Sequence, residues 1–279
     1  MKHLEGETMA DVIAKLKAGD TAYRERFTVE LRARLFLLVL DAVRYAHSRG
    51  VLHRDLKPAN IMVGPYDEVT VMDWGIAKPI GARDPVSAAK DTPTSWIDSQ
   101  DQRLIDTQVG TLAGTPWYMS PEQAAGQNDS LDERSDVYSL ALVFYEWLAL
   151  EHPLEGKSNL LEVLGTIMMT DHDAGVLTRR AGARGVPCEY VYLILRGLRR
   201  DRSERLASVD LMYQQLTDIL DGKVPIECPV TFTKRASHEA LHWVDHHQML
   251  FVALFFIASG GLLFGTITLA LLGIRSLLG

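Results

Sequence analysis

The chain has 279 residues, 47% of them hydrophobic, and its 29 basic and 36 acidic side chains give a formal net charge of −7. The length and apolar content are sufficient for a globular core, and the acidic balance argues against a protein that binds nucleic acid by neutralising phosphates. The two cysteines, Cys188 and Cys228, lack a CxxC spacing, so the sequence indicates neither a zinc site nor a disulfide framework.

The first part of the chain alternates helix signals with a short hairpin signal. Thr8 can cap a first helix, and a second helix is predicted from about Thr28 to Gly50, with apolar side chains at helical spacing. Two β-type runs, residues 61–63 and 69–72, are joined by Gly-Pro-Tyr-Asp, which is a hairpin signature. We therefore expect a mainly α fold of the α+β type with one short β-hairpin.

The second part of the globular region is predicted to be helical. Residues 136–150 are apolar on nearly all sides, which is typical of a helix buried in the middle of a domain. Helical patterns resume after Pro187, and residues 221–245 have the mixed charge of a linker.

The C-terminal region predicts a membrane-spanning helix. From position 246 to 274 there is no Asp, Glu, Lys or Arg. A helix over residues 248–274 would be longer than the roughly 30 Å hydrocarbon layer of a bilayer, and the length argues against a buried core helix. The expected organisation is a globular domain, a juxtamembrane linker, a C-terminal transmembrane anchor and a short tail, at residues 1–222, 223–247, 248–274 and 275–279.

Four short motifs follow one another in the globular region. Residues 53–60 read HRDLKPAN and residues 73–75 read DWG, on either side of the predicted hairpin. They are followed by GTPWYMSPE at 114–122 and SDVYSL at 135–140. In this order and spacing the motifs resemble those of eukaryotic-like serine/threonine protein kinases, most closely the bacterial branch. The resemblance covers residues 1–222 and implies the fold of the larger, C-terminal kinase lobe.

The resemblance implies a catalytic site that uses ATP and Mg²⁺ as cofactors. Asp55 would accept the proton of a substrate hydroxyl, and Lys57 would reach the γ-phosphate of ATP. Asn60 and Asp73 would supply oxygen ligands to Mg²⁺, a hard cation that prefers such atoms. Met62 would lie with Lys57, Asn60 and Asp73 on the cofactor side of the site.

Further residues receive structural or regulatory roles by the same resemblance. His53 is expected to be structural, and Arg54 to pair with a phosphorylated residue of the activation segment through charge-assisted hydrogen bonds. Glu122 and Arg205 resemble the buried ion pair of the family. Asp136 resembles the carboxylate that holds the backbone of the catalytic loop.

The activation segment, residues 73–122, is long. Its middle, residues 79–107, is rich in Asp, Ser, Thr and Pro, which favours an insertion loop. Thr107 and Thr111 are the candidate phosphorylation sites, with ordinary solvated hydroxyls as the alternative. Thr115, in the GTPWYMSPE motif, is grouped with the regulatory or structural residues.

Each catalytic candidate also has an ordinary explanation when it is taken alone. Asp55 and Asn60 could be simple loop residues, His53 a hydrogen-bonded core histidine and Asp73 a turn cap. Their joint spacing favours the catalytic interpretation over these separate ones.

The sequence departs from the kinase pattern at two places. Trp74 stands where phenylalanine is commonest, a change that keeps an apolar side chain beside Asp73. Residues 1–6 resemble the hinge between the kinase lobes, so we expect this sequence to lack the Gly-rich loop, the strand lysine and the helix glutamate that hold ATP. Three explanations stay open: a misplaced start or broken gene of an active kinase, a genuine one-lobe remnant, or a second polypeptide that completes the cleft. The presence of four catalytic side chains favours the first.

The sequence therefore predicts a membrane-anchored serine/threonine protein kinase in truncated form, acting on Ser or Thr of protein substrates. The alternative is a catalytically inactive, membrane-tethered binding module. The expected location is the cell membrane with the kinase part in the cytoplasm, because ATP is there. Gly261 and Gly265 form a GxxxG spacing, which favours close helix pairing and hence a homodimer. No nucleic-acid partner is expected.

Overall fold

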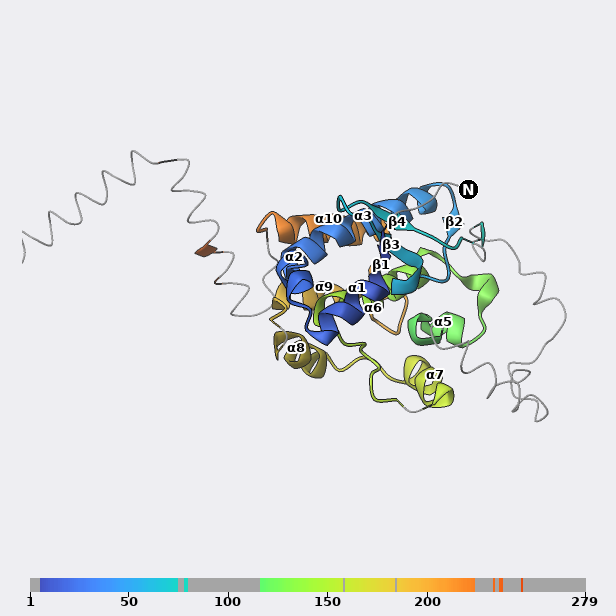
Figure 1. The fold of residues 1–279 in the computed structure, drawn as a ribbon. Coiled ribbons are helices and arrows are strands. Elements are labelled where there is room, and N and C mark those ends of the chain that lie inside the picture. Colours follow the sequence, from blue (N-terminus) through green and yellow to red (C-terminus); the bar gives the residue numbers. More distant parts are fainter. Residues whose placement is uncertain are drawn as a thin grey trace, which may run out of the picture. The chain divides into compact units, whose positions relative to one another are not determined.

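The computed structural model describes residues 6–74, 116–157, 159–183 and 185–223, the backbone of residues 78–79, and a few isolated positions after 230. The chain divides into two compact units, Met1–Lys223 and Val224–Gly279. The labelled helices and strands of Figure 1 belong to the first unit.

The first helices begin at the N-cap residues that the sequence indicates. Helix α1 (Met9–Ala18) begins after Thr8, whose hydroxyl accepts the Asp11 N–H in a capping box. Helix α3 (Val29–Ser48) begins after Thr28, whose hydroxyl accepts the N–H three residues on. These two helix predictions are confirmed.

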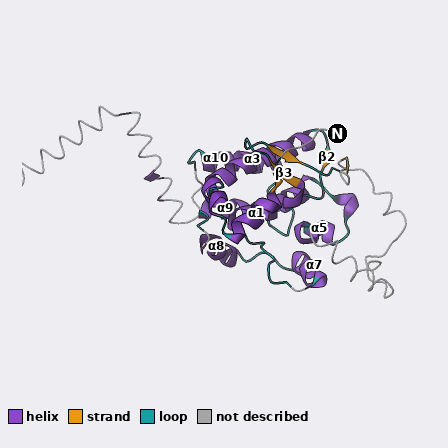
Figure 2. Ribbon diagram, viewed as in Figure 1, coloured by secondary structure: helices purple, strands orange, loops and turns teal. Residues whose placement is uncertain are grey.

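A small antiparallel sheet lies beside these helices (Figure 2). Its strand order is β1 (Glu7–Thr8), β3 (Ile61–Val63) and β4 (Val69–Val71), and Ile61 pairs with Val71. The predicted hairpin is therefore confirmed. The strand β1 joins it from more than 50 residues away in the sequence. A second pair is formed by β2 (Val51–Leu52) and β5 (Lys78–Pro79).

Helix α6 (Glu133–Ala149) is the centre of the domain. Fourteen of its 17 residues are buried, which confirms the predicted buried helix. The rings of Phe36 in α3 and Phe144 in α6 stack at 4.2 Å. Figure 1 shows α10 alongside α3, and these two helices pack closely. Because α6 is enclosed, its polar side chains must find partners inside the protein.

The other elements complete a mainly helical fold with few strands, as the sequence predicts. In the described ranges they are α2 (Thr21–Arg26), α5 (Pro121–Ala124), α7 (Leu160–Met169), α8 (Ala174–Ala183), α9 (Cys188–Gly197), α10 (Val209–Leu220) and the 3₁₀ turns at Pro58–Asn60, Pro116–Tyr118 and Asn128–Ser130.

Within the described residues no helix is both long and apolar enough to cross a bilayer. The predicted span at residues 248–274 lies outside the described residues, as do Thr107, Thr111 and Thr115.

Candidate active site

The first turns of α6 hold the backbone of the HRDLKPAN loop through Asp136. One carboxylate oxygen, Oδ2, accepts the His53 N–H at 2.8 Å and contacts His47 Nε2 at 2.7 Å, and Oδ1 accepts the Arg54 N–H at 2.9 Å. Asp136 and His53 are almost fully buried, and Arg54 has a left-handed backbone with φ 70°. A non-glycine residue in this conformation needs support from its surroundings, which Asp136 supplies.

Asp55 lies between two side chains of its own loop. Lys57 Nζ donates to Asp55 Oδ2 at 2.7 Å, and Asn60 Nδ2 donates to the same oxygen at 3.0 Å and to the Asp55 carbonyl at 2.9 Å. Pro58 begins the 3₁₀ turn that brings Asn60 back toward Asp55. Both Lys57 and Asn60 use Asp55 Oδ2, and within the described residues no hydrogen bond reaches Oδ1.

The hairpin brings Asp73 back to the same loop. The Met72 N–H donates to the Asn60 carbonyl at 2.8 Å, so the residue before Asp73 contacts the backbone of Asn60. Asp73 is exposed and has φ 60°. Met62, in β3, is half-buried two residues after Asn60.

Asn60 and Asp73 fit the preferences of Mg²⁺. Both amide hydrogen bonds of Asn60 go to Asp55, which leaves its amide oxygen as the atom to offer a metal. Among the described residues no group of three His, Cys, Asp or Glu side chains could hold a metal ion. A site with one carboxylate and one amide oxygen suits Mg²⁺, because this ion keeps several of its waters.

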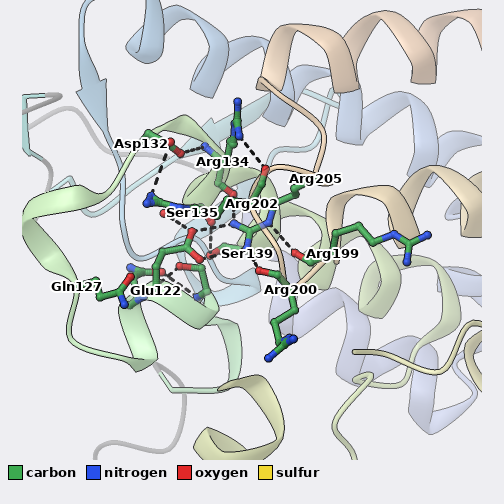
Figure 3. A network of polar contacts seen from close by, with 12 residues as sticks. Glu122, Gln127, Asp132, Arg134, Ser135, Ser139, Arg199, Arg200, Arg202 and Arg205 are labelled. Atoms are coloured by element: carbon green, nitrogen blue, oxygen red, sulfur yellow. Dashed lines mark hydrogen bonds and ion pairs between the residues drawn. The ribbon is translucent and has the colours of Figure 1, made fainter. Parts of the chain in front are cut away.

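Glu122 and Arg205 form a buried, doubly hydrogen-bonded ion pair (Figure 3). Arg205 Nη1 donates to Glu122 Oε1 at 2.8 Å and Nη2 to Oε2 at 3.1 Å, and Ser135 Oγ donates to Oε1 at 2.6 Å. Burial alone would raise the pKa of Glu122, but the hydrogen bonds and charge of Arg205, with Ser135, hold this pKa below its usual range. Arg205 also donates to backbone carbonyls, those of Arg134, Arg199 and Arg200.

One connection between this pair and the catalytic loop was missed by the sequence analysis. Gln123, the neighbour of Glu122, donates from Nε2 to the Arg54 carbonyl at 2.8 Å, while its Oε1 accepts the Ser120 N–H. The Ser-x-x-Gln capping-box pattern was the available signal, because it fixes the orientation of the glutamine side chain.

A cavity of about 480 Å³ opens beside Lys57. It lies between α1, the Pro58–Asn60 turn and α6, and its lining includes Trp117, Tyr118 and Glu146. The Tyr118 hydroxyl donates to Glu146, yet burial raises the pKa of this carboxyl. No local sequence pattern indicates this cavity, because its walls come from segments that are distant in the chain.

The structure therefore brings one set of the predicted site residues together around a single loop and places the others in a second network. Around one loop lie the residues His53, Arg54, Asp55, Lys57, Asn60, Asp73 and Asp136. The Glu122–Arg205 pair forms a second network, which is connected to the loop through its neighbours Gln123 and Ser135.

A family model described as "Protein kinase domain" matches residues 1–217, and the chain belongs to this family. The chain is 33% identical over 227 residues to serine/threonine-protein kinase PknD of Protochlamydia amoebophila, which covers 80% of this chain and 22% of that protein. It is 30% identical over 227 residues to a probable serine/threonine-protein kinase PknB of Bifidobacterium longum, covering 81% of this chain and 28% of that protein. It is also 37% identical over 187 residues to serine/threonine-protein kinase pkn3 of Myxococcus xanthus, covering 66% of this chain and 30% of that protein.

The predicted resemblance to bacterial serine/threonine protein kinases is thereby confirmed. The chain spans between a fifth and a third of the length of these curated relatives.

Proposed function

We propose that this chain is the catalytic lobe of a serine/threonine protein kinase, which transfers the γ-phosphoryl group of ATP to a Ser or Thr hydroxyl of a protein. The observation that carries the proposal is the convergence of Asp55, Lys57 and Asn60 on one another, with the backbone before Asp73 bonded to Asn60. Four residues of the right chemistry in one site are better explained by phosphoryl transfer than by separate loop roles.

Each side chain has a task in this proposal. Asp55 Oδ1 accepts the proton of the substrate hydroxyl, while Lys57 and Asn60 hold the carboxylate by its other oxygen. The ammonium group of Lys57 also lies where it can neutralise charge on the transferred group. Asn60 and Asp73 would hold Mg²⁺, which, when bound, neutralises phosphate charge, and Met62 would lie against the nucleotide.

Regulation by phosphorylation is part of the proposal. Arg54 directly precedes Asp55, so a phosphate on the activation segment that pairs with its guanidinium would act on the backbone of the catalytic loop. Thr107 and Thr111 are the proposed acceptors, and Thr115 a residue that helps to order this segment.

The test of the proposed function is a phosphoryl-transfer assay on a two-lobed fusion. The chain is fused behind a kinase N-terminal lobe and incubated with radiolabelled ATP, Mg²⁺ and a library of Ser- and Thr-containing peptides. We expect label on phosphoserine and phosphothreonine, and none when Mg²⁺ is chelated. A fusion that folds and binds ATP but transfers no phosphate would contradict the proposal and favour the tethered binding module.

The membrane anchor is a second part of the proposal, supported by the uncharged stretch at residues 246–274. The full chain should stay in the membrane pellet after washing with high salt or carbonate, because moving a long apolar helix from lipid to water is too costly. A chain cut after Asp221 should be soluble, since the buried apolar residues of α10 precede the cut. Full-length protein in the carbonate supernatant would contradict the anchor.

A homodimer through the anchor follows from the same segment. Replacing Gly261 and Gly265 by leucine should weaken self-association in a membrane reporter assay and leave insertion intact. The kinase part would lie on the cytoplasmic side of the cell membrane, because ATP is there.

A further inference from the structure

Asp73 has a backbone conformation that needs support. Its φ of 60° lies in the left-handed region, which is unfavourable for a residue with a side chain. The side chain is exposed, so its own packing does not hold the residue there. The neighbours on either side of Asp73 must therefore fix the conformation.

The residue before Asp73 is fixed at both of its backbone polar groups. The Met72 N–H donates to the Asn60 carbonyl, and the Met72 carbonyl lies 3.0 Å from His53 Nε2. His53 Nδ1 accepts the Asp55 N–H at 3.3 Å, so in the neutral ring the proton is on Nε2, which donates to Met72. The catalytic loop therefore holds the chain up to Met72.

The residue after Asp73 is fixed by its indole. Trp74 Nε1 donates to the Val71 carbonyl at 3.0 Å, and the Trp74 ring lies 4.4 Å from the His53 ring with an interplanar angle of 53°. The bond from position 74 to position 71 closes a short loop that contains Asp73. A phenylalanine could keep the ring contact with His53, but it has no N–H and could not close this loop.

We propose that Trp74 is a positioning residue: its hydrogen bond to the Val71 carbonyl holds Asp73 in the left-handed conformation that presents the carboxylate for metal binding. The effect on the metal rests on the proposed function, whereas the effect on the backbone does not. A loop that this bond keeps closed would not lower the apparent metal affinity through a population of open states.

Hydrogen exchange of the full chain in detergent tests the backbone effect. In Trp74→Phe the backbone amides at positions 72, 73 and 74 should exchange about 2- to 10-fold faster than in the wild type. This is the range expected for the loss of one neutral hydrogen bond. Replacing Trp74 by benzothienylalanine, which keeps the bicyclic ring without the N–H, should give the same increase. Unchanged exchange at these amides in both variants would overturn the proposal.

A matched control removes the same kind of bond elsewhere. Trp147 Nε1 donates to the Arg32 carbonyl at 2.8 Å in the buried core. Trp147→Phe should speed amide exchange at residues 72–74 no more than its loss of global stability accounts for. An equal local increase in this control would mean that the effect is not specific to Trp74 and would overturn the proposal.

The metal effect is measured with Mn²⁺ alone, by the loss of its free-ion electron paramagnetic resonance signal. Trp74→Phe should weaken Mn²⁺ binding by up to the same 2- to 10-fold factor, and Asp73→Asn should weaken it more. Faster exchange with unchanged Mn²⁺ affinity would overturn the positioning role. A wild-type chain that does not bind Mn²⁺ would contradict the metal site of the proposed function, and the exchange rates would still decide whether Trp74 holds the loop.

Discussion

Asp55→Asn should lower phosphoryl transfer by about 10²-fold or more while nucleotide binding survives. The substitution keeps the shape of the side chain and an oxygen that can accept the Lys57 hydrogen bond. It removes the basic carboxylate that would take the substrate proton, and it leaves Asn60 and Asp73 in place. The expected change is therefore in kcat, with little change in ATP affinity.

The measurement uses the fusion with a kinase N-terminal lobe, with transfer followed by radiolabel and ATP binding by calorimetry. Asp67→Asn is the matched control, because it makes the same chemical change in the hairpin turn, where Asp67 pairs with Arg26 at 2.9 Å. Asparagine also tolerates the left-handed backbone of position 67. Near-normal turnover in Asp55→Asn would contradict the proposed base.

The parts of the fold that could be predicted from the sequence are those with local signals. Thr8 and Thr28 are N-cap residues whose hydrogen bonds reach only three residues ahead. The hairpin depends on a turn sequence between two adjacent strands, and α6 on apolar residues within one helix. All three predictions use information that lies within about 20 residues.

The parts that could not be predicted depend on contacts between distant segments. Helix α2 has six residues, TAYRER, which are too few and too polar to show an apolar periodicity. None of them is buried. The strand β1 is a strand only because it pairs with β3. Its two residues contain no β-type run of their own.

The candidate site divides in the same way. The resemblance to kinases gave Asp136 its role, but not its third partner: His47, 89 residues away in the sequence, contacts the same carboxylate. Likewise the resemblance implied a role for Lys57 toward phosphate, and the structure adds a hydrogen bond from Lys57 to Asp55. The motifs indicate which residues belong to the site, and the folded structure shows which of them hydrogen-bond to the same group.

The largest effect on stability is expected from Arg205→Met. Arg205 and Glu122 are both almost fully buried, and the variant leaves the Glu122 carboxylate without its cation. Breaking a buried ion pair on one side costs about 3–5 kcal/mol. For a domain of this size that loss should lower the melting temperature by roughly 10 °C, measured by thermal unfolding of the full chain in detergent.

Arg34→Met is the control, because Arg34 and Glu30 form a similar pair on the surface of α3, with side chains 57% and 67% exposed. Its cost should be about 0.5 kcal/mol or less, since exposed pairs contribute little. An equal loss in the two variants would contradict the importance of burial.

The pH dependence separates the charge from the other bonds of Arg205. The pKa of Glu122 is lowered in the folded protein, so the stability from its ionised form is present above about pH 4.5 and is lost as the pH falls through the folded pKa. The deficit of Arg205→Met should therefore shrink toward low pH, where the variant's carboxyl becomes neutral.

Adding Glu122→Leu to Arg205→Met removes the unpaired charge altogether and should recover part of the loss at pH 7. A double variant no more stable than Arg205→Met would assign the cost to the bonds between Arg205 and the backbone carbonyls, not to the buried charge.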